Sequence, residues 1–374
     1  MSTTKARRIF TEEVSALCPG EVRLKGWVYR LRILGKTAFI ILRDCTGEAQ
    51  CVIASEALKD HKLKVEDVIE ISGTVRAEPR ARTGCEVDVS EVHVLNRAGQ
   101  TLPFQSAANV ETVGLDTLLQ YRPLSLRTEA VGDIFRIQAA ILVYETAHVY
   151  RAEPHASSRH LTEYYSLDVE FGFIEGPEDV IQFERELLTD IFANLNVKYG
   201  ELIRKYRTDL LPSMLDVPIW EFDTCLEILR ADFGRTDMED DLDPLAERQL
   251  CERAAQENGI PAVFVLGFPL SARPFYTAPR GSQGAAGSFD LLFQGLEITT
   301  GGQRLHRRED LESALRSRFI APANFESHLA MFDLGMPPHG GFAVGLERLT
   351  CQVLNLPNVR QAVLYPRDRY KITP

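Results

Sequence analysis

The chain has 374 residues, which is enough for roughly two or three domains with a sizeable core. Hydrophobic residues make up 45% and charged residues 25%, as is typical of a soluble globular protein. The sequence has no apolar run long enough to span a membrane, no secretory signal at residues 1–14 and no CxxC pair among its seven cysteines, so it predicts a cytoplasmic protein without a zinc site.

The charge is unevenly distributed along the chain. The total of 42 Lys and Arg against 53 Asp and Glu gives a net charge of −11, which by itself does not favour nucleic-acid binding. Residues 1–43, however, carry nine Lys or Arg and only three acidic residues. A local basic region can bind a phosphate backbone whatever the total charge, although charge alone favours the simpler interpretation of a solvated basic face.

Residues 20–96 have the pattern of short strands. Apolar and polar residues alternate, and turn signals separate the segments VRLKGWVY, TAFIILRD, EAQCVI, VIEISGTVR and CEVDVSEVHVL. Five strands in so short a segment predict a small closed barrel of the OB-fold type, which often binds oligonucleotides on one face. Candidates for that face are Trp27, Tyr29, Arg30, Arg32, Phe39 and Gln50. The alternative, that Trp27 and Phe39 belong to the core, fits the pattern equally well.

Beyond the barrel the pattern changes twice. Residues 97–130 are rich in small and polar residues and predict a linker with a short hinge helix. Helical spacing follows at 178–195 and 245–259, and buried strands are predicted at 262–266, 288–293 and 340–346. We therefore expect an α+β protein with three parts: a barrel at 1–100, a hinge at 101–130, and an antiparallel sheet flanked by helices at 131–374.

The first chemical constellation is YRAEPHASSRHLTEYYSLDVE, residues 150–170. It has the pattern of a hairpin on which Arg151 and Arg159 can face the same space. Paired guanidinium groups suit a polyphosphate, because each gives bidentate hydrogen bonds and keeps its charge. Glu153 and His160 could orient a base or a pyrophosphate. The alternative is a surface hairpin with ordinary salt bridges.

The second constellation lies in residues 288–311. Asp290 and Glu297 are seven positions apart across a strand, and carboxylates beside a phosphate site suit Mg²⁺. Thr300 can add a hydroxyl, and Arg304 is a cation suited to a carboxylate substrate. A buried strand followed by an ordinary turn is the competing interpretation.

The third constellation is MPPHGGFAVGLERLTCQVL, residues 336–354. A strand runs into a helix that should begin near Glu347, which places Arg348 in the first helical turn. The helix dipole disfavours a cation there, whereas an anion bound at the helix N-terminus would explain it. Alternatively Arg348 is a surface arginine.

Together these segments resemble motifs 2 and 3 of class II aminoacyl-tRNA synthetases and the strand between them. The order of barrel, hinge and α+β region is similar to the aspartyl/asparaginyl subgroup. The segments HGGFAVGLERL and LPNVRQAVLYPRDRYKITP resemble the archaeal-type aspartyl enzymes. The resemblance covers almost the whole chain. It implies an aspartate–tRNA ligase that uses ATP, Mg²⁺, L-aspartate and tRNA(Asp), and that forms a homodimer.

The resemblance also implies roles for particular residues. Arg151 would hold the ATP α-phosphate and the amino-acid carboxylate, and Arg348 would bind the γ-phosphate, so these two are the expected catalytic residues. The implied ATP site consists of Arg151, Glu153, Arg159, His160, Leu161, Glu297, Gly345, Leu346, Glu347 and Arg348. The other implied sets are Glu297 and Thr300 for Mg²⁺, Arg151, Thr300 and Arg304 for aspartate, and Phe39, Gln50 and Glu86 for the tRNA anticodon.

The chain departs from the family pattern in three places. Pro154 replaces the usual carboxylate, and Thr300 replaces a serine. In addition, residues 133–142 run almost directly into 143–151, where the family has several tens of further residues. The missing segment normally carries the end of motif 1 with its dimer-interface proline, a TEGG-type loop that binds the substrate amino group, and an SPQLYK-type helix that reads aspartate.

Two other functions are compatible with this shortening. One is a catalytically impaired paralogue that binds tRNA through the barrel. The other is a different adenylate-forming ligase on the same fold, against which the intact barrel argues. The sequence leaves open whether tRNA(Asn) is a substrate as well as tRNA(Asp).

Overall fold

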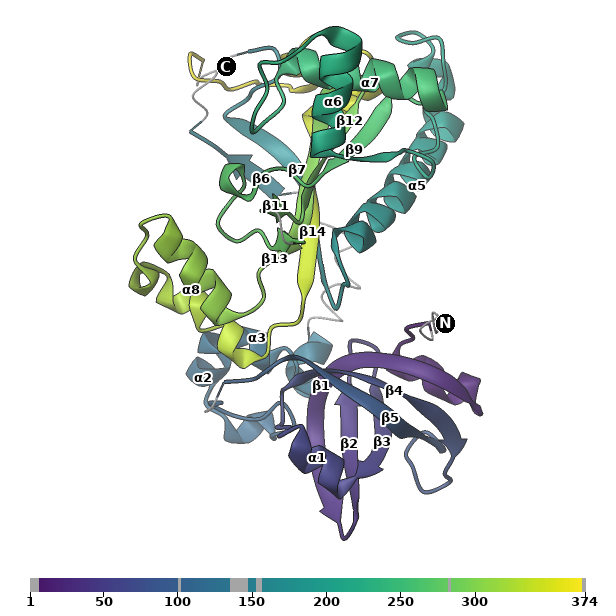
Figure 1. The fold of residues 1–374 in the computed structure, drawn as a ribbon, viewed down its shortest axis with the longest axis vertical. Coiled ribbons are helices and arrows are strands. Elements are labelled where there is room, and N and C mark those ends of the chain that lie inside the picture. The colour runs from purple at the N-terminus through teal and green to yellow at the C-terminus, as the bar shows by residue number, and fades with distance from the viewer. Residues whose placement is uncertain (1–6, 100–101, 135–146, 153–156, 282–283, 372–374) are drawn as a thin grey trace. The chain divides into compact units, whose positions relative to one another are not determined.

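The computed structural model describes residues 7–99, 102–134, 147–152, 157–281 and 284–371 (Figure 1). Contacts within the chain divide it into two compact units. The first unit consists of Met1–Tyr144 and His306–Pro338, and the second of Glu145–Leu305 and His339–Pro374. Each unit is therefore assembled from two separate segments of the chain.

The first unit contains the predicted five-stranded barrel. Its strands are β1 (Gly20–Leu34), β2 (Thr37–Arg43), β3 (Glu48–Ala54), β4 (Val68–Ala77) and β5 (Cys85–Asn96), and they close in the order β1-β2-β3-β5-β4. In β2, Ala38, Ile40 and Leu42 are fully buried. Because side chains alternate along a strand, Phe39 lies on the outer face. The barrel also carries a 3₁₀ helix, η1 (Thr11–Leu17), and α1 (Ser55–Asp60).

A largely buried arginine joins the separate segments of the first unit. The Arg127 guanidinium pairs with the buried Glu66 carboxylate at 3.1 Å, donates to the carbonyls of Leu334 and Gly335, and stacks on Trp27. This ties the barrel to the segment before residue 134 and to His306–Pro338. The short elements of these segments are η2 (Val110–Thr112), α2 (Leu115–Gln120), α3 (Arg122–Ser125), α8 (Arg308–Ser317), η4 (Pro322–Phe325), α9 (Glu326–Leu329) and η5 (Phe332–Leu334).

The second unit is built on a seven-stranded sheet in the order β6-β7-β14-β13-β12-β9-β8 (Figure 1). The strands are β6 (Ala147–Tyr150), β7 (Glu163–Gly172), β8 (Ile219–Glu221), β9 (Ala262–Leu266), β12 (Ser288–Phe293), β13 (Leu296–Arg304) and β14 (His339–Gly345). All neighbours are antiparallel except β8 and β9, so the prediction of an antiparallel sheet is confirmed apart from this edge. A two-stranded sheet pairs β10 (Pro279–Arg280) with β11 (Ala285–Ala286).

Helices cover both faces of the sheet. Along β9, Phe264 and Leu266 belong to the apolar cluster of α5 (Pro177–Ile203), whereas Val263 and Val265 belong to that of α6 (Phe222–Phe233) and α7 (Pro244–Asn258). Burial on both faces explains why β9 is a continuous apolar run. The remaining helices of this unit are η3 (Leu270–Ala272), α10 (Leu346–Val353) and η6 (Val359–Ala362).

Local signals set the ends of α7. The Asp243 carboxylate accepts the backbone N–H groups of Leu245 and Ala246, which is the usual contact of an N-cap. Gly259 follows the helix with φ 74°, a left-handed conformation that suits glycine. The predicted stop at Gly259 is therefore confirmed.

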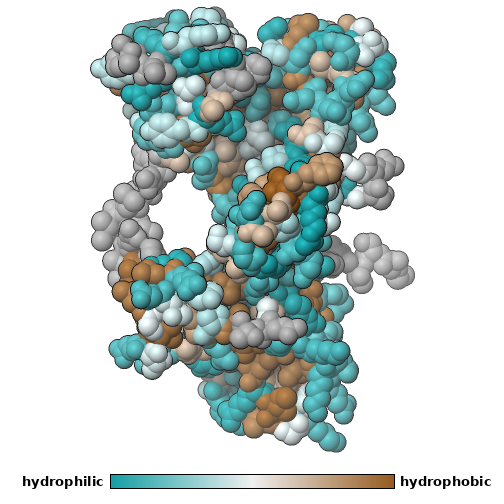
Figure 2. Space-filling view, turned by 90° about the vertical axis from the view of Figure 1, so that its left-hand side faces the viewer, coloured by the Kyte–Doolittle hydropathy of each residue, from teal (hydrophilic) through white to brown (hydrophobic). Residues whose placement is uncertain are grey.

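The surface contains both hydrophilic and apolar areas. Hydrophilic residues cover most of the face shown in Figure 2, and smaller hydrophobic areas lie between them. Among the described residues, no helix is both long and apolar enough to cross a membrane.

Candidate active site

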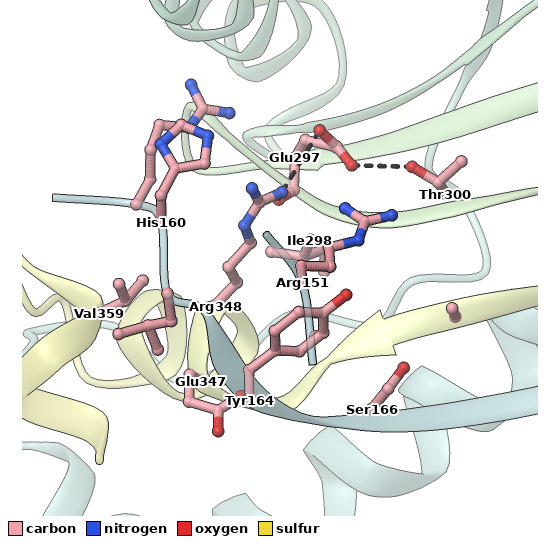
Figure 3. Close-up of a pocket in the computed structure, with 14 residues that line it drawn as sticks. Arg151, His160, Tyr164, Ser166, Glu297, Ile298, Thr300, Glu347, Arg348 and Val359 are labelled. Atoms are coloured by element: carbon pink, nitrogen blue, oxygen red, sulfur yellow. Dashed lines mark hydrogen bonds and ion pairs between the residues drawn. The ribbon is translucent and has the colours of Figure 1, made fainter. Parts of the chain in front are cut away.

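The second unit has a cavity of about 310 Å³ on the face of the sheet opposite α5. Segments more than one hundred residues apart in sequence contribute to its wall. Nine residues expected from the sequence line it: Arg151, Arg159, His160, Leu161, Glu297, Thr300, Gly345, Glu347 and Arg348. The fold therefore brings the three predicted constellations together in one cavity (Figure 3).

The β6–β7 hairpin supplies the first group. Arg151 directly follows β6, and its backbone N–H donates to the carbonyl of Thr162 at 2.9 Å, which continues the hairpin. Arg159 and His160 lie just before β7, and the His160 ring nitrogen Nδ1 is 2.7 Å from the Ser157 hydroxyl. Glu153 lies outside the described residues, so its predicted place in the site is not described.

Glu297 is the central carboxylate of the cavity. Thr300 donates its hydroxyl hydrogen to Glu297 Oε1 at 2.8 Å, and Arg348 lies 3.3 Å from Oε2. Burial alone would raise the pKa of Glu297, but Arg348 and the Thr300 hydroxyl outweigh burial and hold that pKa below its usual value. Glu297 is therefore ionised at neutral pH, with the Thr300 oxygen beside it.

Arg348 is positioned by α10, which begins at Leu346, one residue before the predicted start. Its guanidinium also donates to the carbonyl of Glu297 at 3.0 Å, so it crosses from α10 to β13 and is not a simple surface arginine. The neighbouring Glu347 carboxylate accepts the Tyr165 backbone N–H at 2.9 Å, which holds the start of α10 against β7. Leu346, predicted for the ATP site, is 42% exposed and does not line the cavity.

Arg159 has a partner that sequence reasoning missed. Its Nη2 donates to both carboxylate oxygens of Glu247 on α7, at 2.6 and 2.7 Å. Burial raises the pKa of Glu247 to about 7, although Arg159 opposes the rise. A signal was present in the sequence, because Glu247 lies three, four and seven positions before Leu250, Cys251 and Ala254, on the apolar face of the helix.

Arg304 lies outside the cavity wall. It forms a bidentate pair with Glu170 of β7 at 3.0 Å and lies over the Tyr276 ring, 4.8 Å from its centre. Any carboxylate substrate that binds Arg304 must compete with Glu170.

Asp290 is buried and engaged by another arginine. Arg273 holds both of its carboxylate oxygens, at 2.7 and 3.2 Å. Burial raises the pKa of Asp290 to about 6, against the opposing effect of Arg273. Glu297 and Thr300 bring a carboxylate and a hydroxyl side by side on the cavity wall, and oxygen donors of this kind fit Mg²⁺, which takes few protein ligands.

Five further residues line the cavity without having been assigned a role: Tyr164, Ser166, Ile298, Ala343 and Val359. In Figure 3 the Tyr164 ring and the Arg348 side chain lie on neighbouring parts of the wall. An aromatic ring and a guanidinium plane can both stack on a planar base. The cavity therefore offers cationic groups for phosphates and flat groups for a base.

The predicted anticodon residues share a second hollow, on the barrel of the first unit. Phe39 from β2, Gln50 from β3 and Glu86 from β5 all line it, together with basic residues that include Arg30, Arg32, Arg76 and Arg80. The Gln50 amide donates to Glu86 at 2.7 Å, and Arg76 pairs with Glu86 at 2.6 Å. These contacts orient the Gln50 amide, so that its carbonyl oxygen can serve as a hydrogen-bond acceptor.

Comparison with known families gives two matches. The family described as tRNA synthetases class II (D, K and N) matches residues 140–369, and the OB-fold nucleic acid binding domain matches residues 22–95. Together they cover the sheet of the second unit and the barrel of the first.

Individual relatives align over nearly the whole chain. An aspartate–tRNA(Asp/Asn) ligase of Thermus thermophilus is 35% identical, covering 98% of this chain and 100% of that protein. An aspartate–tRNA(Asp) ligase of Thermococcus kodakarensis is 30% identical, again covering 98% and 100%. The solved structure of the aspartyl tRNA synthetase of Entamoeba histolytica is similar with a TM-score of 0.58 and 26% identity, covering 100% of this chain and 94% of that one.

The alignments also bear on the shortened segment. The match to the Thermus thermophilus protein runs over 427 residues, whereas this chain has 374, so at least 53 aligned positions have no counterpart here. Several tens of missing residues were expected between residue 142 and the hairpin. The predicted junction falls mostly on residues 135–146, which lie outside the described residues.

Proposed function

We propose that this chain, which belongs to the class II tRNA synthetases of the D, K and N group, is an aspartate–tRNA ligase. It activates L-aspartate with ATP and transfers the aspartyl group to tRNA(Asp). The observation that carries the proposal is the single cavity that gathers nine residues expected for ATP binding and activation. The relatives give no support to the alternative of an impaired tRNA-binding paralogue.

ATP is proposed to bind with its phosphates among the arginines of the cavity. Arg151, Arg159 and Arg348 all line it, and guanidinium groups bind phosphate oxygens in a bidentate manner. In the structure Arg348 is paired with Glu297. Binding of the triphosphate would give Arg348 an anionic partner in place of Glu297 and leave this carboxylate available.

Mg²⁺ is proposed to bind at Glu297 with Thr300 beside it. When bound, the ion would neutralise part of the charge that accumulates on the pyrophosphate. Before ATP binds, Arg348 and the Thr300 hydroxyl hold the pKa of Glu297 below its usual value against burial, so the carboxylate is already ionised when Arg348 turns to the phosphates. Asp290 remains with Arg273 in this arrangement.

The chemistry needs positioning and charge stabilisation, and no protein nucleophile. The α-carboxylate of aspartate attacks the α-phosphorus of ATP, the bond to the bridging oxygen breaks, and pyrophosphate leaves. Arg151 and Arg348 stabilise the negative charge that develops in this step. The terminal ribose hydroxyl of tRNA then attacks the aspartyl carbonyl, and AMP leaves. Arg304 is proposed to bind the aspartate side chain by exchanging Glu170 for the substrate carboxylate.

The barrel is proposed to read the anticodon. Phe39, half-buried on the wall of the hollow, supplies an aromatic face for stacking, and the Gln50 amide, oriented by Glu86, supplies hydrogen bonds to a base. Related ligases include one named for tRNA(Asp) alone and one named for tRNA(Asp/Asn). Aminoacylation of purified tRNA(Asp) and tRNA(Asn) would decide between them for this chain.

The deciding experiment is aspartate-dependent exchange of pyrophosphate into ATP by the 374-residue chain, with asparagine as the control substrate. Exchange with aspartate is the expected result. It would mean that the residues present read aspartate without the TEGG-type and SPQLYK-type segments. A folded, ATP-binding sample that shows no exchange would contradict the proposal.

The family resemblance also predicts a homodimer, and the scattered cysteines without a CxxC pair predict a cytoplasmic location. The end of motif 1, which carries the family's dimer-interface proline, lies in the shortened segment. Light scattering on the purified chain is expected to give the mass of a dimer, twice 42.0 kDa. A monomer that still catalyses exchange would separate activity from dimerisation.

A further inference from the structure

Glu247 does not touch the cavity, yet it contacts two of the groups that form it. Its Oε1 and Oε2 accept hydrogen bonds from Arg159, and its Oε2 also accepts the backbone N–H of Glu297 at 2.8 Å. Glu247 thus connects Arg159, which is expected to bind phosphate, with β13, the strand that carries the expected metal ligand Glu297. Along the chain, Glu247 is 88 residues from Arg159 and 50 residues from Glu297.

Burial makes this carboxylate a rigid support. Glu247 is 5% exposed, and the Arg159 side chain is 14% exposed. A buried carboxylate without a partner is costly, so the contact with Arg159 is strongly favoured in the folded state. Arg159 would otherwise be a long side chain with several rotatable bonds, and ordering it on ATP binding would cost free energy.

The helix that carries Glu247 is itself docked against the turn before Glu297. Gln294 and Gly295 form the β12–β13 turn with φ angles of 51° and 82°. A Cβ atom on Gly295 would lie only 2.6 Å from Cγ of Arg248, so the glycine lets α7 approach the turn closely. Close packing of α7 on Gly295 therefore brings this helix next to the start of β13, and Glu247 bridges the two.

From this geometry we infer that Glu247 is a positioning residue for ATP, which holds the Arg159 guanidinium and the β13 backbone at Glu297 in the arrangement that binds the triphosphate. The inference rests on the proposed function for the identity of the nucleotide. Glu247 does not line the cavity in which the substrate and the metal are proposed to bind. Its effect should therefore be limited to ligands that carry phosphates.

The test measures Mg-ATP and adenosine binding to the whole chain by calorimetry. Glu247→Gln keeps a similar shape but removes the charge that holds Arg159, and it should weaken ATP binding about tenfold or more. Adenosine binding should change less than about twofold, because adenosine offers no phosphate to Arg159. The matched control is Glu252→Gln, an exposed carboxylate on the same helix, which should leave both affinities unchanged.

A double-mutant cycle separates positioning from a general structural defect. If Glu247 acts through Arg159, then adding Glu247→Gln to Arg159→Met should cost little further ATP affinity. Equal loss of ATP and adenosine binding, additive losses in the cycle, or unchanged ATP binding in Glu247→Gln would each overturn the inference. So would a lack of Mg-ATP binding by the unaltered chain.

These binding measurements are independent of pyrophosphate exchange. A chain that binds ATP in the expected pattern but shows no aspartate-dependent exchange would sustain the role of Glu247 and remove the proposed ligase activity. The two ideas can therefore fail separately.

Discussion

The two faces of β13 place a carboxylate in opposite surroundings, one partly exposed and paired, the other fully buried. On the cavity face, Glu297 is surrounded by Arg348 and the Thr300 hydroxyl, which outweigh burial and lower its pKa. On the other face, Glu184 of α5 is completely buried in the described structure, and burial raises its pKa to about 8. Burial has the larger effect there, although the neighbouring Thr299 hydroxyl opposes the rise in the pKa.

The contrast shows that the side chains on one face of a strand can bind ligands while those on the other face stabilise the fold. The cavity face holds charges that are paired with one another and can be paired with a ligand instead. The α5 face is an apolar cluster in which Phe264, Phe289 and Phe293 are fully buried. Changes on the first face should alter activity more than stability, and changes on the second should do the reverse.

The largest effect is expected from Arg348→Ala on the cavity face. Removing a cation that stabilises transition-state charge should lower the pyrophosphate exchange rate by about 1000-fold. The melting temperature should change little, since Arg348 is at the cavity wall and partly exposed. Arg204→Ala, a change at the exposed residue that follows α5, is the control and should exchange at the normal rate. Exchange within tenfold of normal in Arg348→Ala would remove this residue from the mechanism.

Phe289→Ala tests the α5 face of the sheet, where a change should affect stability more than activity. Phe289 is fully buried and meets the Phe264 ring edge-on with 5.7 Å between ring centres. Losing the ring should destabilise the second unit by about 3–5 kcal/mol, from lost burial and the cavity left behind. Urea unfolding measures the loss, and ATP affinity of the remaining folded protein should be close to normal. A loss below 1 kcal/mol would mean that this face is not the main core.

Glu184→Gln tests the buried carboxylate of the α5 face through the pH dependence of stability. The folded-state pKa of about 8 lies above the usual value of 4.5, so between these values the folded chain binds one more proton than the unfolded chain. Stability should therefore fall as pH rises from about 5 to 8, by about 1.4 kcal/mol per pH unit at most. The glutamine variant should lack this slope and be the more stable protein at pH 8. Identical slopes in urea titrations of both proteins would contradict the raised pKa.

Gln50→Ala tests the first unit, where neither face of β13 is involved. Aminoacylation should lose about tenfold in kcat/KM for tRNA, from one or two lost hydrogen bonds to a base. Pyrophosphate exchange without tRNA should stay at the normal rate. A fall in exchange would show that the barrel change reaches the second unit, and the separation of roles would be wrong.

Much of the fold could be predicted because its signals are local. The five barrel strands follow from alternation, and the end of α7 follows from Gly259. The parallel pair of β8 and β9 was not predicted, because Ile219–Glu221 is too short for a periodic pattern. The site roles assigned from family resemblance, including those of Arg151, Glu297 and Arg304, remain predictions for the experiments described above.

By itself, the sequence determined which elements form and which residue types are available for chemistry, since hydrophobic periodicity, caps and turn residues act over a few positions. Only the tertiary structure decided the partners of the charged groups: Arg159 with Glu247, Arg304 with Glu170, and Asp290 with Arg273. These partners lie 88, 134 and 17 residues apart. Pairing at such separations depends on strand register and helix docking, which are set by how the buried apolar faces pack together.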